Sequence, residues 1–303
     1  MLYFINIRQN SIYFTHIVHW LSIISHRIDD FVIMSIQQIE LENNKKNKAN
    51  LHDIIYPIIF LTAFIGVWQL VFTLGIFPKI SLPSPIIVTE TFAKIILNGS
   101  LPWSVGITLE RLLVAFAVSI TFGTGIGLAM VKFKGFGKTL NSFSAGLLSF
   151  PSIAWIPFSI LLIGFNEFGI MFVVIMSSIF SIMISTYSSV RNIPPIYLDA
   201  AKNMGARGIS LFRHVTIPAA TPSLIIGLRQ GWSFSWHAII GAEILMSIVG
   251  LGHILSVGRE FLDMSQVIAS MITIFTIGLV VDRFLLHKIE DKIRTKWGLD
   301  HHR

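Results

Sequence analysis

Long stretches without a single charged residue recur along this chain of 303 residues. Each of the five clearest is near or above the roughly 20 residues that cross about 30 Å of hydrocarbon. They are Ile54–Phe77, Leu112–Val131, Leu140–Phe165, Phe168–Val190 and Met264–Val281. The chain is 53% apolar and 13% charged, whereas a soluble domain carries about 25% charged residues. A soluble fold with one large core is therefore excluded, and each stretch is expected to span a membrane as a helix.

A sixth stretch, Ile217–Val249, is long enough to span but contains Arg229, His237 and Glu243. Such groups must face protein or water rather than lipid. Arg229 and Glu243 are 14 residues apart, about 21 Å along a helix, so they cannot pair with each other. Arg229 is expected to extend toward the cytoplasmic headgroups, and Glu243 to brace either a subunit interface or an outer gate. The chain is expected to be an all-α polytopic membrane protein with six transmembrane helices.

Basic residues are distributed unevenly between the loops. With the N-terminus inside, sixteen of the Lys and Arg residues from Lys45 onward fall in cytoplasmic segments and three, Lys79, Lys94 and Arg259, in external ones. Because cytoplasmic loops carry the excess of basic residues, both termini are expected in the cytoplasm. The net charge is +7, but the basic residues are distributed between the apolar segments and do not form the single patch that a nucleic-acid site requires. No nucleic-acid partner is therefore expected. The absence of Cys excludes disulfides and thiolate metal sites.

The chain divides into two regions. Residues 1–50 are expected to be a partly disordered N-terminal extension, with Met34 as the native start because the lysine-rich leader Asn43–Asn50 follows it. No small-residue cleavage site follows Ile17–Ile24, so this segment is not expected to be a signal peptide. Residues 51–303 are expected to form one transmembrane domain. Its expected spans are 54–77, 112–131, 140–165, 168–190, 217–249 and 264–286, with a cytoplasmic loop at 191–216.

Prolines mark two local features. Ser84 is a suitable cap and Pro85 a suitable first residue for a helix over Ile86–Leu97, which is expected to lie flat at the membrane surface. Within the third span, Pro151 and Pro157 each remove a backbone donor. A simple kink and a bundle with an irregular interior are equally compatible with this pair.

A short charged helix is expected in the loop between the fourth and fifth spans. Pro195 has the fixed φ of a first helical position and Gly205 is a natural stop, which leaves two to three turns. No lipid can bury this helix, so a soluble partner is expected to contact it, and Ala200 and Ala201 allow close approach. Asp199 is expected in the first turn, where the helix macrodipole stabilises a carboxylate.

The loop has a regular spacing. Asp199-Ala-Ala is followed by three residues, Gly205, nine residues and Val215-Thr-Ile217-Pro218. This resembles the EAA loop in the membrane subunits of binding-protein-dependent ABC importers, with Asp for Glu, Val for Ile and Ile for Leu. Further segments resemble the aliphatic sulfonate, taurine and nitrate branch of these permeases. They are Leu82–Pro85, Thr108–Arg111, Pro157–Gly164, Arg191–Pro194, Gly231–Glu243, Gly250–Gly252 and Lys296-Trp297.

The resemblance implies the type I ABC importer permease fold in a bacterial cytoplasmic membrane, surrounded by lipid. It implies a second permease subunit, typically in a homodimer, two copies of a cytoplasmic ATP-binding subunit, and an extracytoplasmic solute-binding protein. The small solute would be of the sulfonate, taurine or nitrate type. It places ATPase docking on Tyr197, Leu198, Asp199, Ala200, Ala201, Gly205, Ile217 and Pro218. This chain lacks the phosphate-binding pattern Gly-x-x-x-x-Gly-Lys-[Ser/Thr], so ATP and Mg are expected on the partner and no cofactor, metal or catalytic residue on this chain.

Five residues are candidates for the translocation path or a gate: Arg111, Trp232, Trp236, His237 and Glu243. An arginine suits an oxyanion, but an ion pair between Arg111 and Glu110, or an interfacial anchor, explains Arg111 equally well. Aromatic residues at helical spacing more often serve packing than a solute path.

Two other classes of protein fit the sequence less well. An intramembrane enzyme needs a catalytic constellation at membrane depth, and none is present in the sequence. A secondary transporter or channel without an ATPase partner also needs six or more spans and buried polar groups. That alternative leaves the loop helix unexplained.

Overall fold

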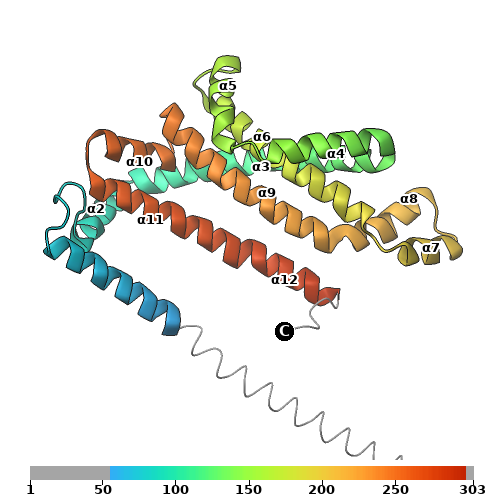
Figure 1. Ribbon diagram of the computed structural model, residues 1–303, viewed down its shortest axis with the longest axis horizontal. Helices are drawn as coiled ribbons and strands as arrows, with labels where there is room; N and C mark the ends of the chain where they lie inside the picture. The colour runs from blue at the N-terminus through green and yellow to red at the C-terminus, as the bar shows by residue number, and fades with distance from the viewer. Residues whose placement is uncertain (1–54, 298–303) are drawn as a thin grey trace, which may run out of the picture. The chain divides into compact units, whose positions relative to one another are not determined.

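The computed structural model describes residues 55–297, so the expected start at Met34 and the N-terminal extension lie outside the described residues. The first helix, Ile55–Thr73, is long and apolar enough to cross a membrane. From Val71 onward the chain forms a separate compact unit, whose described residues are helical without a strand (Figure 1). Its helices are α2 (Pro85–Leu97), α3 (Ser100–Lys132), α4 (Lys134–Leu148), α5 (Trp155–Leu162), α6 (Glu167–Arg191), α7 (Pro195–Asn203), α8 (Gly208–Leu211), α9 (Ile217–Met246), α10 (Leu251–Glu260), α11 (Met264–Val280) and α12 (His287–Lys296).

Helices α3, α6 and α9 pack against one another and form the centre of this unit. Small residues let them approach closely, as is common between helices in membranes. A Cβ at Gly127 of α3 would lie 2.6 Å from the Cβ of Thr186 in α6, and one at Gly227 of α9 would overlap the side chain of Ser185. The centre therefore depends on glycines facing α6.

The helix expected over Ile86–Leu97 is present. Helix α2 begins at Pro85, and the Ser84 hydroxyl accepts a hydrogen bond from the Ile87 N–H at 3.3 Å. Helix α3, in contrast, begins at Ser100 rather than near Leu112. It continues through Arg111 because that side chain is buried and paired, as described below, so its charge does not end the helix.

The stretch 140–165 is not one straight helix. It contains α4 and, after a break, the short 3₁₀ turn Ser152–Ala154 with α5, and the two parts are bent by 94°. The break falls at Pro151, which lacks an N–H and disfavours helical geometry in the residue before it. Pro157 is the third residue of α5, where a helix has no internal use for the N–H. Among the residues that the structure describes, five single helices are long and apolar enough to cross a membrane, and six spans are reached when the bent pair counts as one.

The last two long helices each contain a wider π segment. Residues Gly208–Met246 run continuously through the π segment Phe212–Thr216, where the Ile217 N–H donates to the Phe212 carbonyl. Pro218 follows directly and has no backbone N–H to donate to a carbonyl of the preceding turn. This missing hydrogen bond explains why the helix widens here. Residues Met264–Lys296 run through a second π segment, Val281–Leu286.

Candidate functional site

Helix α7 has the expected limits. It begins at Pro195 and ends before Gly205, whose φ of +90° favours glycine. The Gly205 N–H donates to the Lys202 carbonyl at 3.0 Å and the Ala206 N–H to the Ala201 carbonyl at 2.9 Å. This pair of bonds is the Schellman motif, which satisfies the last carbonyls of a helix. Gly205 thus stops α7 through its backbone conformation.

Asp199 does not lie in the first turn, so that expectation was wrong. Pro195 opens the helix, and Asp199 is its fifth residue, with no acidic residue in the first turn. Its carboxylate accepts a hydrogen bond from Lys202 Nζ at 3.1 Å, and both side chains are more than half exposed. The helix dipole acts mainly on the terminal turns, so Asp199 is held by Lys202 and remains accessible to a partner.

A groove of about 630 Å³ separates α7 from the beginning of α9. Tyr197, Ala200 and Ala201 line one wall, Pro218 lies on the α9 side, and Trp297 also contributes. Leu198 and Ile217 are not part of this lining, and Tyr197 remains 57% exposed. The structure therefore gathers four of the eight expected docking residues around one groove.

A cluster of buried polar side chains lies at the end of α9 that is farther along the chain from α7. The Glu243 side chain is fully buried. It accepts hydrogen bonds from the Thr108 hydroxyl at 2.8 Å and from the Gly252 N–H at 3.0 Å. The Thr108 hydroxyl also accepts the Leu251 N–H at 2.9 Å. This carboxylate thus ties α3 and α9 to the first residues of α10.

Arg111 completes this cluster and spans two carboxylates. It lies 3.4 Å from Glu243 and 2.8 Å from Glu167, and it donates to the Val249 carbonyl at 2.6 Å. Arg111 is only 3% exposed, while the Glu167 side chain is 63% exposed. The alternative of a local pair with Glu110 is wrong, because adjacent residues of a helix do not face each other.

Glycines leave the space that the cluster needs. A Cβ at Gly250 would overlap the Glu243 carboxylate, and one at Gly252 would lie 2.7 Å from the Glu243 Cβ and 2.6 Å from the Ile240 carbonyl. The turn between α9 and α10 can therefore close over the carboxylate only with these two residues. The sequence indicated Arg111 and Glu243 separately, but their partners Thr108 and Glu167 were missed.

Arg229 forms ion pairs within the protein, whereas the sequence suggested an extension to headgroups. Its Nε donates to Asp282 at 2.8 Å and its Nη2 to the other Asp282 oxygen at 2.7 Å. Its Nη1 donates to Glu290 at 2.9 Å. These bonds join α9 to the final helix. Asp282 directly follows the apolar run Met264–Val281, which was the available sign of such a partner.

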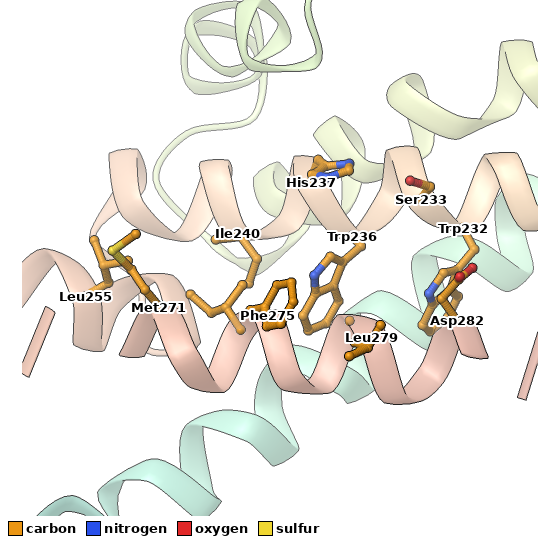
Figure 2. A pocket seen from close by; sticks show the side chains of 12 residues that line it. Trp232, Ser233, Trp236, His237, Ile240, Leu255, Met271, Phe275, Leu279 and Asp282 are labelled. Carbon is orange, nitrogen blue, oxygen red and sulfur yellow. The ribbon is translucent and has the colours of Figure 1, made fainter. Parts of the chain in front are cut away.

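A cavity of about 510 Å³ lies between α9 and α11. Figure 2 shows Trp232 and Trp236 projecting from α9 toward α11, while His237 and Ser233 lie along the opposite edge of α9. Trp232 and Trp236 are 7% and 8% exposed, and Trp232 packs edge-on against Phe116. Of the five candidate path residues, three therefore meet at this cavity. Arg111 and Glu243 meet instead in the polar cluster.

Comparison with known proteins places this arrangement among transport subunits. The family described as binding-protein-dependent transport system inner membrane component matches residues 119–293. A putative ABC transporter permease protein of Methanocaldococcus jannaschii is 31% identical over 262 residues, which cover 82% of this chain and 96% of that protein. The putative aliphatic sulfonates transport permease protein SsuC of Escherichia coli is 28% identical over 248 residues, covering 82% and 94%. The bicarbonate transport system permease protein CmpB of Synechococcus elongatus is 28% identical over 257 residues, covering 80% and 90%.

Among solved structures, the fold is similar to the MetNI methionine ABC transporter in an inward-facing conformation. The TM-score is 0.50 at 17% identity, and the match covers 63% of this chain and 96% of that chain. At this identity the likeness shows the fold alone, which is that of a type I importer permease.

Proposed function

This chain belongs to the family of binding-protein-dependent transport system inner membrane components, and on that premise we propose that it couples a solute path to a cytoplasmic ATPase through α7. It is a membrane-integrated permease subunit of an ABC importer, a class that works with an ATPase and a solute-binding protein. Two copies of this chain would pair in the membrane, each docked to one ATPase subunit. Both termini and α7 would face the cytoplasm, in keeping with the excess of basic residues on that side.

The observation that carries this proposal is the form of α7. It is a short exposed helix with a defined start and stop, placed between the two long apolar helices α6 and α9. Ile196 and Tyr197 expose 71% and 57% of their surface. Docking would bury these side chains and engage Asp199. Because the π segment and α9 follow directly, a movement of the docked helix would be passed to α9.

We further propose that the solute is a small oxyanion or a molecule that carries one. The relatives named for aliphatic sulfonates and for bicarbonate support this class. The cavity between α9 and α11 would form part of the path, and the cluster of Arg111 and Glu243 would brace an external gate. Arg111 would act through Glu167 and Glu243 rather than by binding solute, since its two terminal nitrogens are already engaged.

Replacing Gly205 tests the coupling role. A Gly205→Leu substitution forces a branched side chain into a φ of +90°, although no atom lies within 4 Å of its Cβ position. The strain costs about 1–2 kcal/mol and should distort the end of α7 without disturbing the bundle. We expect the reconstituted importer to keep basal ATPase activity but to lose most of its solute-stimulated ATPase activity and uptake.

A matched control uses Gly99, which has a φ of +79° and equally open surroundings at the start of α3. Gly99→Leu introduces comparable strain far from α7 in sequence and should leave the stimulation of ATPase activity intact. Normal stimulated ATPase activity and uptake in the Gly205 variant would reject docking through α7.

A further inference from the structure

Between α9 and α11, the described part of the chain places no Lys or Arg side chain in the cavity to hold an anion. Among the described residues that line it, none is Lys or Arg, and the ionisable ones are His237 and Asp282. Asp282 is already engaged by two nitrogens of Arg229. Arg111 lies in the separate polar cluster and has its terminal nitrogens occupied. An ion that depends on a salt bridge therefore finds no partner there.

The interior of the cavity is built from rings and aliphatic groups. Trp236 lies between Phe275 and Leu279 in Figure 2, and Trp232 faces the end of the cavity near Asp282. Gly278 gives the Trp236 ring its place, because a Cβ there would lie 2.9 Å from the indole nitrogen. No hydrogen-bond acceptor for the indole N–H of Trp232 or Trp236 is found among the described residues. The cavity thus combines apolar walls with two neutral donors and a polar rim of Ser233 and His237.

The volume of about 510 Å³ falls within the range of about 300–1,000 Å³ typical of small-molecule sites. A bare inorganic oxyanion would exchange its water shell for mostly apolar surface, which is unfavourable without charged partners. An organic solute gains from burying its carbon body against the rings. Its acceptor oxygens can meet the indole donors or remain near the polar rim.

We infer that this cavity binds the apolar body of an organic oxyanion, and that it selects such a solute over an inorganic oxyanion. The inference rests on the proposed function, because it takes α9 as a wall of the translocation path. It adds that discrimination within the membrane depends on the carbon body, through Trp232, Trp236 and Phe275, rather than on the charged head.

The absence of Cys from the sequence permits a direct test by single-cysteine labelling. Ser233→Cys places one thiol at the exposed rim of the cavity, and its modification by a maleimide is followed in the purified permease–ATPase complex. Benzenesulfonate and methanesulfonate share a head group and differ in their body, while nitrate has no carbon body. At equal concentration and ionic strength, benzenesulfonate should slow labelling about tenfold relative to nitrate, and methanesulfonate should have a small effect.

Two further variants tie the effect to the rings. In the Ser233→Cys background, Trp236→Ala should abolish protection by benzenesulfonate, and Trp236→Phe should retain part of it because a ring is kept. Ser142→Cys, on an exposed position of α4 outside the cavity, should label at the same rate with every probe. Binding of the ATPase subunit to each variant verifies that the complex is intact.

Equal protection by nitrate and benzenesulfonate would overturn the inference, as would protection by neither probe. Slower labelling caused only by added phospholipid would also overturn it, since an acyl chain would then be the occupant. These outcomes are distinguishable from failure of the proposed function. That function fails when the Gly205→Leu importer couples normally, whatever the probes do at Ser233→Cys.

Discussion

Substituting Glu243 by glutamine removes the charge at the centre of the buried cluster while conserving side-chain shape. The carboxylate accepts hydrogen bonds from Thr108, Gly252 and Arg111 at 2.8, 3.0 and 3.4 Å. An amide has one acceptor oxygen, so its NH₂ group must face at least one of these donors. The substitution therefore creates an unfavourable contact between two donors, in addition to weakening the attraction to Arg111.

The magnitude follows from the individual contacts. A hydrogen bond to a charged group contributes about 1.5–3 kcal/mol, but within membranes such bonds average about 0.6 kcal/mol because the reference state also finds partners. Arg111 retains Glu167 and the Val249 carbonyl, so it is not left without a partner. Three hydrogen bonds at this membrane average add up to about 2 kcal/mol, which is the loss of unfolding free energy that we expect. It is equivalent to a fall in apparent Tm of roughly 4–8 °C for a domain of this size.

The assay is the thermal unfolding of the detergent-solubilised protein, with Glu167→Gln and Glu110→Gln as matched controls. The Glu167 side chain is 63% exposed, so its pair with Arg111 contributes less than about 1 kcal/mol. Glu110 lies on the exposed side of α3, and its substitution should leave the Tm unchanged. A Glu243→Gln protein that unfolds within about 2 °C of the wild type, or above Glu167→Gln, would refute the stabilising role assigned to the cluster.

Three further predictions concern helix packing, an ion pair between helices and a helix cap. Gly127→Leu should prevent close contact of α3 with α6 and abolish recovery of folded protein from the membrane. The control Gly125→Leu, whose added Cβ meets no atom within 4 Å, should be recovered normally. Size-exclusion chromatography of the two purified variants measures this difference. Arg229→Lys replaces a guanidinium group, which donates to both carboxylate oxygens of Asp282, with a single ammonium group. It should lower the Tm by about 2–4 °C, corresponding to roughly 1 kcal/mol for partly exposed pairs. Ser84→Ala removes the cap of α2 and should cost about 1 kcal/mol, measured as faster hydrogen exchange in the first turn of α2.

Features that depend on a few neighbouring residues could be predicted from the sequence. Pro195 and Gly205 fixed the ends of α7, and Ser84 with Pro85 fixed the start of α2, because capping and φ restrictions are local. Four of the five clearest apolar runs likewise correspond to single helices that can cross a membrane, because hydropathy is also a property of consecutive residues. The bend near Pro151 was less accessible, since whether a proline kinks or breaks a helix depends on which neighbours satisfy the freed carbonyls.

The pairing of the buried charges could not be predicted, although the need for partners could. An ionisable group inside a membrane protein requires a partner, yet Arg111 and Glu243 are separated by 132 residues and belong to helices whose crossing no local pattern fixes. The Gly250-Leu-Gly252 turn held the missing information, because only glycine leaves room for the Glu243 carboxylate there. That carboxylate also anchors the beginning of α10, and Leu255 of α10 lines the cavity between α9 and α11. A change at Glu243 is therefore expected to reach the cavity through α10, even though Glu243 itself does not line it.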